Sequence, residues 1–255
     1  MKNNIVIIGM GEMGGVFARG FLKSGHPVIP VIRNMDMNAL VTQIDTPELV
    51  LVAVAENDLQ STLGDLPKAW CVNTVLLQNE LLPGDWAKHN LNEPTVISVW
   101  FEKKKGQDYK VLIPSPAYGP KADLLQSSLQ SIDIPCRTLI NEAELLHELV
   151  LKNVYIITTN VAGLITGGTV SELWSKHETL ARTVANDVID IQEQLTGKTL
   201  DRDLLIKDML IAFNGDPDHN CMGRSAPARL QRAIDIADNA GLAIKKIREI
   251  ASSIK

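Results

Sequence analysis

The stretch Ile5-Val6-Ile7-Ile8-Gly9-Met10-Gly11-Glu12-Met13-Gly14 decides the fold of this chain. Its four β-branched residues predict a buried strand, and a helical pattern over Glu12–Ser24 begins where the turn ends. The glycines have the spacing G-x-G-x-x-G, which between a strand and a helix permits a tight turn that a pyrophosphate group can approach closely. We therefore predict that residues 9–14 bind a dinucleotide. A glycine-rich connection that holds no ligand is the alternative.

Short apolar runs alternate with helical patterns through the rest of the first half. The runs are rich in Val and Ile and are bounded by Gly, Pro, Asn or Asp, which is typical of strands. This alternation indicates a parallel sheet with helices on both faces. Lys103–Gly106 is interpreted as a solvated turn between two strands rather than as a basic patch. The further strands that we expect are Val28–Ile32, Leu49–Val54, Val72–Leu77, Val96–Phe101 and Lys110–Ile113.

The second half changes character after about Asn141, because only helical patterns follow. We therefore expect an α/β protein in which a Rossmann-type parallel-sheet domain, residues 1–140, precedes an all-helical domain, residues 141–255. The helical domain would complete the binding cleft. The helical segments are Glu142–Trp174, Lys176–Leu195, Asp201–Phe213 and Ala226 to the C-terminus with a break at Gly241.

Composition and charge exclude several classes of partner. The 255 residues carry a net charge of −5, which argues against a general nucleic-acid binder and against anionic membrane surfaces. No apolar run reaches the roughly 18 residues of a membrane span. The three cysteines, Cys71, Cys136 and Cys221, are too far apart in sequence for a C-x-x-C motif. We expect a cytoplasmic protein that binds neither nucleic acid nor membrane and has no structural metal.

The end of the second predicted strand indicates which dinucleotide binds. An NAD-selective site usually has an acidic residue there, whereas this chain has Arg33 and Asn34. A guanidinium suits a 2′-phosphate because it can bind the group with paired hydrogen bonds. We predict NADP(H), with Arg33 on the 2′-phosphate and Asn34 beside it. The alternative is that Arg33 is a solvated residue at a strand end.

Two polar residues interrupt the apolar pattern of Leu149–Leu164, which is otherwise typical of a buried helix. A buried lysine has a lowered pKa unless it is paired, so Lys152 is a candidate for acid–base chemistry. Asn160 follows two turns later near the same face. The alternative is that Lys152 extends out to water near the helix start. Asn79 ends the strand Val72–Leu77 at the edge where ligands of such sheets lie, although Asn commonly caps turns there.

A loop near the C-terminus holds several potential metal ligands. Asp216-Pro217-Asp218-His219-Asn220-Cys221 matches no zinc or calcium spacing, so we interpret it as a proline-containing connection between helices. His219 could still line the cleft. Arg224 and Arg229 follow, and either could face a carboxylate or lie on a helix surface.

Together these residues resemble the ketopantoate reductase (2-dehydropantoate 2-reductase) family, within the wider 6-phosphogluconate-dehydrogenase-like group. The matches are the Gly9–Gly14 turn with Gly25-His26, Arg33, the run Leu77-Gln78-Asn79, and Lys152 with Asn160. The resemblance implies a Rossmann domain followed by a helical domain and the reduction of a 2-keto group by NADPH. It also implies that Lys152 is the general acid and that Asn79 lies near cofactor and substrate.

The chain departs from the family at several positions. The family usually has a lysine after the third strand, where this chain has Glu56, and an additional Asn where it has Ile156. A family glutamate near the C-terminus has no counterpart around Ser225. We expect an NADP(H)-dependent reductase of a small 2-keto acid-like substrate, possible as a homodimer, with Lys152, Asn79 and Asn160 as catalytic residues. An NADP(H)-binding sensor without turnover, or a related imine or hydroxy-acid reductase, are the alternatives.

Overall fold

The structure is a computed structural model that describes residues 2–254. Two compact units, Met1–Leu149 and Val150–Lys255, divide the chain, and the division falls inside the long helix α7 (Glu142–Thr166). The expected boundary after residue 140 lies just before this helix. Each unit is described by itself below.

The first unit is built on a seven-stranded sheet with the order β2-β1-β3-β4-β5-β8-β9. The first five strands in this order are parallel, β8 runs antiparallel to β5, and β9 is parallel to β8. This arrangement confirms the expected α/β class with a mostly parallel sheet. The strands are β1 (Ile5–Ile8), β2 (Val28–Val31), β3 (Leu49–Val52), β4 (Thr74–Leu76), β5 (Thr95–Ile97), β8 (Ser115–Tyr118) and β9 (Cys136–Thr138).

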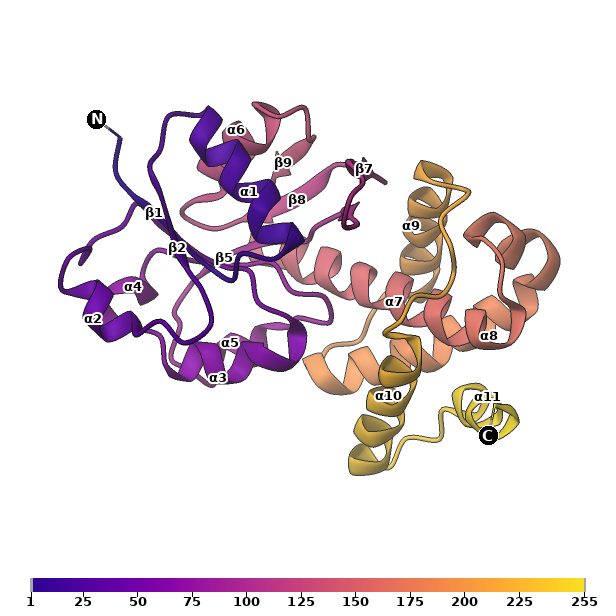
Figure 1. Ribbon diagram of the computed structural model, residues 1–255. Coiled ribbons are helices and arrows are strands. Elements are labelled where there is room, and N and C mark those ends of the chain that lie inside the picture. Colours follow the sequence, from indigo (N-terminus) through magenta and orange to yellow (C-terminus); the bar gives the residue numbers. More distant parts are fainter. Residues whose placement is uncertain (1, 255) are drawn as a thin grey trace. The chain divides into compact units, whose positions relative to one another are not determined.

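The central strands are apolar on both faces because helices cover both sides of the sheet. Every residue of β1 and β3 is buried. The helices α1 (Glu12–Lys23) and α6 (Ala122–Gln130) lie on one face and the short helices α2 to α5 on the other (Figure 1). The short helices are α2 (Met37–Val41), α3 (Leu59–Gly64), α4 (Lys68–Cys71) and α5 (Pro83–Ala87), with the 3-10 turn η1 (Glu56–Asp58) before α3.

The strand order places a topological switch point between β1 and β3. The chain leaves β1 for β2 on one side and then crosses to β3 on the other side of β1. In open α/β sheets, ligands bind outside the carboxyl ends of the strands at such a point. Gly9 follows β1 and Ala53 follows β3 at this point.

Two expectations about the strands were wrong. The expected strand Val96–Phe101 divides into β5 and β6 (Phe101–Lys103), because the chain leaves the main sheet between them to form a two-stranded antiparallel hairpin with β7 (Tyr109–Val111).

The hairpin itself is confirmed, but Lys103 is not at its solvated tip. Its side chain is 20% exposed, whereas that of Lys104 is 57% exposed. Strands β8 and β9 were not expected.

The second unit is helical, as the sequence predicted. Gly167 and Gly168 have positive φ and end α7, and a capping box formed by Thr169 and Glu172 starts α8. Helix α8 packs against each of the three helices that follow it. These elements are α8 (Val170–Thr196), α9 (Arg202–Gly215), α10 (Ala226–Ala240) and α11 (Lys245–Ser253).

Helix α7 is long and apolar enough to cross a membrane by length and composition alone. However, 72% of its most apolar 18-residue window is buried inside the protein. A helix that is apolar nearly all round and buried is a core helix of a folded protein. The interruption by Lys152 therefore occurs in a largely buried element.

Candidate active site

The glycine turn closes tightly on its neighbours at two of its three glycines. Gly9 has a φ of +96°, and a Cβ there would lie 2.7 Å from the Ala53 carbonyl oxygen at the end of β3. A Cβ on Gly14 would overlap the Gly9 carbonyl oxygen. Packing of the turn against β3 and of α1 against the turn therefore requires glycine at both positions.

Gly11 differs from the other two glycines, because the fold does not require it. It is the N-cap residue of α1, no side chain caps the helix there, and a Cβ on Gly11 would meet nothing within 4 Å. The helix end therefore presents its first N–H groups, and the positive end of its dipole, to open space. Bare backbone at this point fits the close approach of a pyrophosphate. Met13 packs against the sheet core, and Met10 is exposed.

Arg33 and Asn34 lie at the carboxyl end of β2, in the turn after the strand. The Arg33 side chain is 89% exposed, and its Nη2 lies 3.9 Å from Asp58 Oδ2. Asn34 has a φ of +73°, a left-handed conformation that Asn tolerates in turns. The guanidinium is therefore accessible to a phosphate group, and Asp58 is the acidic residue nearest to it. Sequence reasoning did not single out Asp58.

The ends of β3 and β4 are tied together by amide side chains. The buried Gln78 donates from Nε2 to the carbonyl oxygens of Val52 and Val54, at 2.7 and 3.2 Å. Asn79 Nδ2 donates to Glu56 Oε1 at 3.1 Å. Asn79 thus pairs with Glu56, the residue that stands where the family resembled by the sequence usually has a lysine. The signal that could have found this pair is that both residues directly follow neighbouring parallel strands.

Lys152 lies on α7 with its ammonium close to an aromatic ring. Its Nζ lies 5.9 Å from the centroid of the Tyr155 ring. Burial, the larger cause, and the positive charge of Arg229 together lower the pKa of Lys152 to about 7. A lysine with this pKa holds its proton in about half of the molecules at neutral pH, which suits an acid–base group.

Asn160 connects α7 to the segment that precedes α10. Its Nδ2 donates to the Cys221 carbonyl oxygen at 3.0 Å, and its Oδ1 accepts from Arg229 Nη1 at 2.8 Å. The segment comes close to α7 because Gly163 has no side chain: a Cβ there would lie 2.8 Å from Cys221 Cβ. Asn160 therefore positions Arg229, which is half-buried, whereas Arg224 is exposed.

The loop between α9 and α10 is confirmed as the proline-containing connection. His219 Nδ1 lies 3.5 Å from Asp216 Oδ2, and the His219 ring centroid lies 6.2 Å from that of Tyr155. Within residues 2–254, no three His, Cys, Asp or Glu side chains are grouped closely enough to hold a metal ion.

The predicted residues thus form two groups. The turn of residues 9–14, Arg33 and Asn79 follow strands β1, β2 and β4 at the carboxyl edge of the parallel sheet in the first unit. Lys152 and Asn160 lie with Arg229 in the second unit. The sequence pattern did not rank Arg229 above Arg224. In the structure Arg229 differs from Arg224 by its hydrogen bond to Asn160, its partial burial and its effect on the pKa of Lys152.

No protein-family model matches this chain, and no curated protein matches it in sequence. Solved structures do match. A 2-dehydropantoate 2-reductase from Methylococcus capsulatus is 15% identical with a TM-score of 0.67, and the match covers 98% of this chain and 95% of the other. A probable 2-dehydropantoate 2-reductase from Bacillus subtilis is 17% identical with a TM-score of 0.70 and 98% coverage of both chains.

A D-mandelate dehydrogenase in complex with NADH also matches, with 13% identity, a TM-score of 0.67, and coverage of 98% of this chain and 97% of the other. The chain therefore has the fold of the ketopantoate reductases over nearly its whole length. The family resemblance seen in the sequence is confirmed at the level of the fold.

Proposed function

We propose that this protein is an NADP(H)-dependent oxidoreductase that reduces the carbonyl group of a small, 2-keto acid-like substrate. The observation that carries the proposal is the glycine turn at the switch point of the parallel sheet, where Gly11 leaves the N-terminus of α1 bare and open. The ketopantoate reductase fold supports a keto-acid reductase, and the dehydrogenase with NADH supports a nicotinamide cofactor.

The turn of residues 9–14 would hold the pyrophosphate, and Arg33 with Asn34 the adenosine 2′-phosphate. Asn79 follows β4 at the same edge of the sheet and would contact the cofactor. When bound, the nicotinamide supplies the hydride. The protein supplies orientation and charge.

Lys152 would donate a proton to the carbonyl oxygen as the general acid, because its lowered pKa allows the proton to leave near neutral pH. Asn79 and Asn160 would orient the substrate. Asn160 already accepts a hydrogen bond from Arg229, so part of its role would be to hold that guanidinium for an anionic group of the substrate.

Partners and location follow from the same proposal. The substrate is a small molecule, and a homodimer is supported by the dimeric ketopantoate reductase from Staphylococcus aureus, which is 14% identical with a TM-score of 0.67 over 98% of this chain and 97% of the other. The buried α7 supports a soluble protein, and we propose a cytoplasmic location.

A second function is favoured by specific residues. Glu56 and Ile156 stand where the resembled family usually has a lysine and an asparagine, and no glutamate lies around Ser225. These replacements suit a sensor that binds NADP(H) without turnover.

The decisive experiment measures NADPH oxidation with a panel of small 2-keto acids. We expect turnover with at least one of them, loss of turnover in Lys152→Ala, and unchanged NADPH affinity in that variant. Lys245→Ala, at an exposed lysine on α11, is the matched control and should behave as the natural protein does. NADPH binding without turnover of any 2-keto acid, imine or hydroxy acid supports the sensor instead.

Cofactor choice is tested separately at Arg33. Arg33→Ala should weaken NADPH binding about tenfold or more, because the variant loses a bidentate contact between guanidinium and 2′-phosphate. NADH has no 2′-phosphate, so its binding should stay nearly unchanged. Dissociation constants for both dinucleotides give the ratio. If that ratio does not change, the assignment of Arg33 is wrong.

A further inference from the structure

Glu12 places a carboxylate next to the turn to which the proposed function assigns a pyrophosphate. It is the first residue of α1 and directly follows Gly11, the bare residue of the turn. A carboxylate at a helix N-terminus is stabilised by the helix dipole. The same charge repels a diphosphate that binds to the same N–H groups, so the turn needs a cation close to Glu12.

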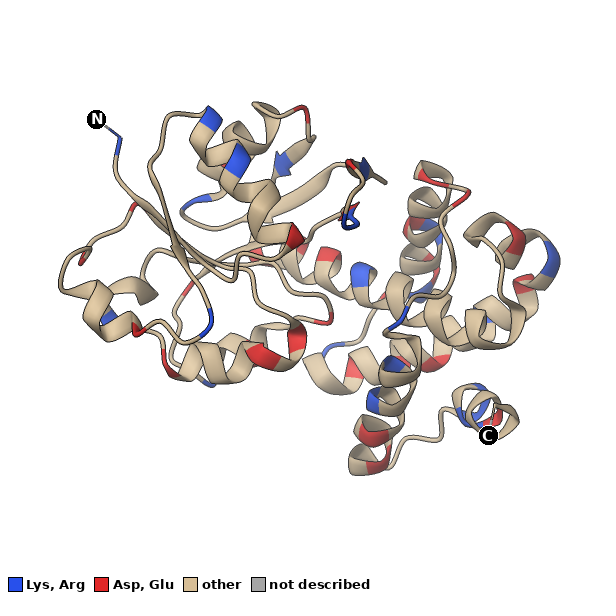
Figure 2. Cartoon of the chain, in the orientation of Figure 1, with Lys and Arg blue, Asp and Glu red and all other residues tan. Residues whose placement is uncertain are grey.

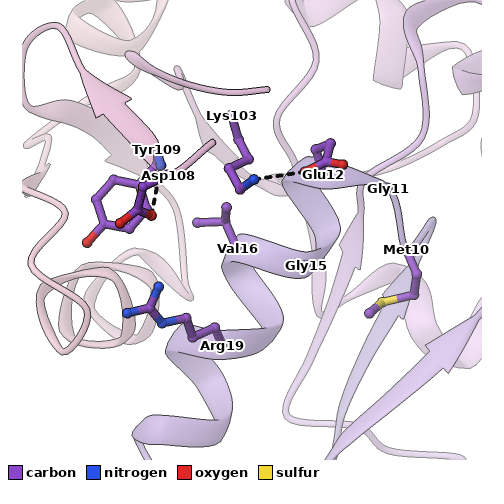
Figure 3. Close-up of a pocket in the computed structure, with 9 residues that line it drawn as sticks. All are labelled: Met10, Gly11, Glu12, Gly15, Val16, Arg19, Lys103, Asp108 and Tyr109. Atoms are coloured by element: carbon purple, nitrogen blue, oxygen red, sulfur yellow. Dashed lines mark hydrogen bonds and ion pairs between the residues drawn. The ribbon is translucent and has the colours of Figure 1, made fainter. Parts of the chain in front are cut away.

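Lys103 on β6 provides that cation. Its Nζ lies 3.1 Å from Glu12 Oε2 and donates to the Lys104 carbonyl oxygen at 2.9 Å. The Lys103 side chain is 20% exposed and that of Glu12 is 43% exposed, so water screens this ion pair only in part. In Figure 3 the Lys103 side chain extends from the hairpin toward the start of α1 and ends at Glu12.

The hairpin is fixed against α1, so the position of Lys103 is not incidental. The centroid of the Phe101 ring, at the start of β6, lies 6.0 Å from the centroid of the Phe17 ring on α1. A cavity of about 280 Å³ lies between helix and hairpin, with Gly11, Glu12, Arg19, Lys103 and Tyr109 among its lining residues (Figure 3). Basic and acidic residues are interspersed along the hairpin in Figure 2. Of these, Lys103 pairs with Glu12 of the turn.

We propose that Lys103 is a positioning residue for the dinucleotide: it neutralises Glu12, and the neutralised turn can then accept the pyrophosphate. The inference rests on the proposed dinucleotide site and extends that site from the βαβ unit to the β6–β7 hairpin. It predicts that the effect of Lys103 on binding depends on Glu12. A lysine that only tethers the hairpin through Glu12 would show the same dependence, but Glu12→Gln alone would then weaken binding as Lys103→Gln does.

The test is a double-mutant cycle on the full chain, read by isothermal titration calorimetry with NADPH and NADH. Lys103→Gln should weaken binding about tenfold when Glu12 is present and less than about threefold when Glu12→Gln is also present, since only coupled residues deviate from additivity. Glu12→Gln alone should bind at least as tightly as the natural protein. Lys103→Arg keeps the charge and should restore the affinity.

Lys104→Gln is the matched control, because Lys104 lies next to Lys103 but pairs with Glu102 at 2.9 Å, away from the turn. It should leave both dissociation constants unchanged. An equal loss of affinity with and without Glu12, or no loss at all, overturns the inference and leaves the proposed function intact. A natural protein that binds neither dinucleotide overturns the proposed function itself, so the two failures are distinguishable.

Discussion

Lys152 is the residue whose chemistry depends most on its surroundings. The sequence places a lysine in an apolar helix, which is compatible with either a perturbed group or one that reaches water. In the structure, burial and the positive charge of Arg229 both disfavour the ammonium form of Lys152. Together they bring its pKa to about 7. The sequence pattern marked the position, and the three-dimensional neighbours give Lys152 the lowered pKa that a general acid needs, whereas its catalytic role stays a prediction.

The pH dependence of catalysis follows from this pKa. A general acid must be protonated, so kcat/KM for carbonyl reduction should fall as pH rises through about 7. The reverse oxidation needs the unprotonated amine and should rise over the same interval. Rates measured from about pH 5.5 to 9 test this expectation.

Variants of Arg229 test whether the pKa of Lys152 sets this pH profile. Arg229→Met removes a positive charge that lowers the pKa of Lys152, so the pH profile should move to higher pH, whereas Arg229→Lys should leave it nearly unchanged. A profile that is flat across this range, or that moves to lower pH in Arg229→Met, contradicts the role given to Lys152.

Residue pairing is where sequence reasoning reached its limit. Asn79 and Asn160 were identified as single polar residues, but each acts with a partner that lies far away in sequence. Asn79 pairs with Glu56, and Asn160 joins Cys221 to Arg229. Periodicity reports which face of an element a residue lies on. It does not report which distant side chain meets it there.

At the scale of elements, the strand–turn–helix unit makes a prediction about its own glycines. Gly11→Ala should fold normally, because its Cβ meets nothing, yet it should weaken dinucleotide binding at least about tenfold by blocking the close approach of the pyrophosphate. Gly14→Ala should lose folded protein, because its Cβ overlaps the backbone of Gly9. Thermal unfolding and titration with NADPH measure the two effects separately.

Gly15 is the matched control for these variants. It lies on the same helix with nothing within 4 Å of its Cβ, so Gly15→Ala should raise stability by about 0.5–1 kcal/mol through helix propensity. A Gly11→Ala variant that binds NADPH as tightly as the natural protein argues against pyrophosphate contact at this turn.

The elements that the sequence missed have identifiable reasons. Strand β8 contains Pro116, and proline in a short run argues against a strand inside a sheet. In the structure the Pro116 carbonyl accepts from Ser98 N at 2.9 Å, so β8 pairs with β5 although Pro116 itself donates no hydrogen bond. Strand β9 has three residues, two of them exposed, which leaves almost no apolar pattern to detect.

At the scale of the whole molecule, the pattern of apolar and polar residues along the sequence predicts the fold better than the identity of individual residues does. The change from short apolar runs to long helices was sufficient to predict a parallel-sheet unit followed by a helical one. Structures that share this fold are only 13–17% identical to the chain. A buried apolar position tolerates many residues, whereas a substrate contact tolerates few. The fold is therefore predictable at an identity where the substrate is not.

Association of two copies is the property of the whole molecule that the sequence left open. Exposed apolar side chains mark a face of α9, where Leu204 is 40% and Ile211 53% exposed. The two residues are seven apart, so they lie on the same side of the helix. Leu195 near the end of the neighbouring α8 is 45% exposed as well. Apolar side chains exposed on one face of a helix favour contact with another protein surface.

We expect a homodimer that uses this face of α9, because a symmetric contact needs one self-complementary patch. Sedimentation velocity should give twice the chain mass of 27.9 kDa, and the double variant Leu204→Glu with Ile211→Glu should give a single chain with unchanged helix content. Val72→Glu, at an exposed apolar residue of the first unit, should remain dimeric. A natural protein that sediments as one chain at every concentration contradicts the dimer. A double variant that stays dimeric places the interface elsewhere.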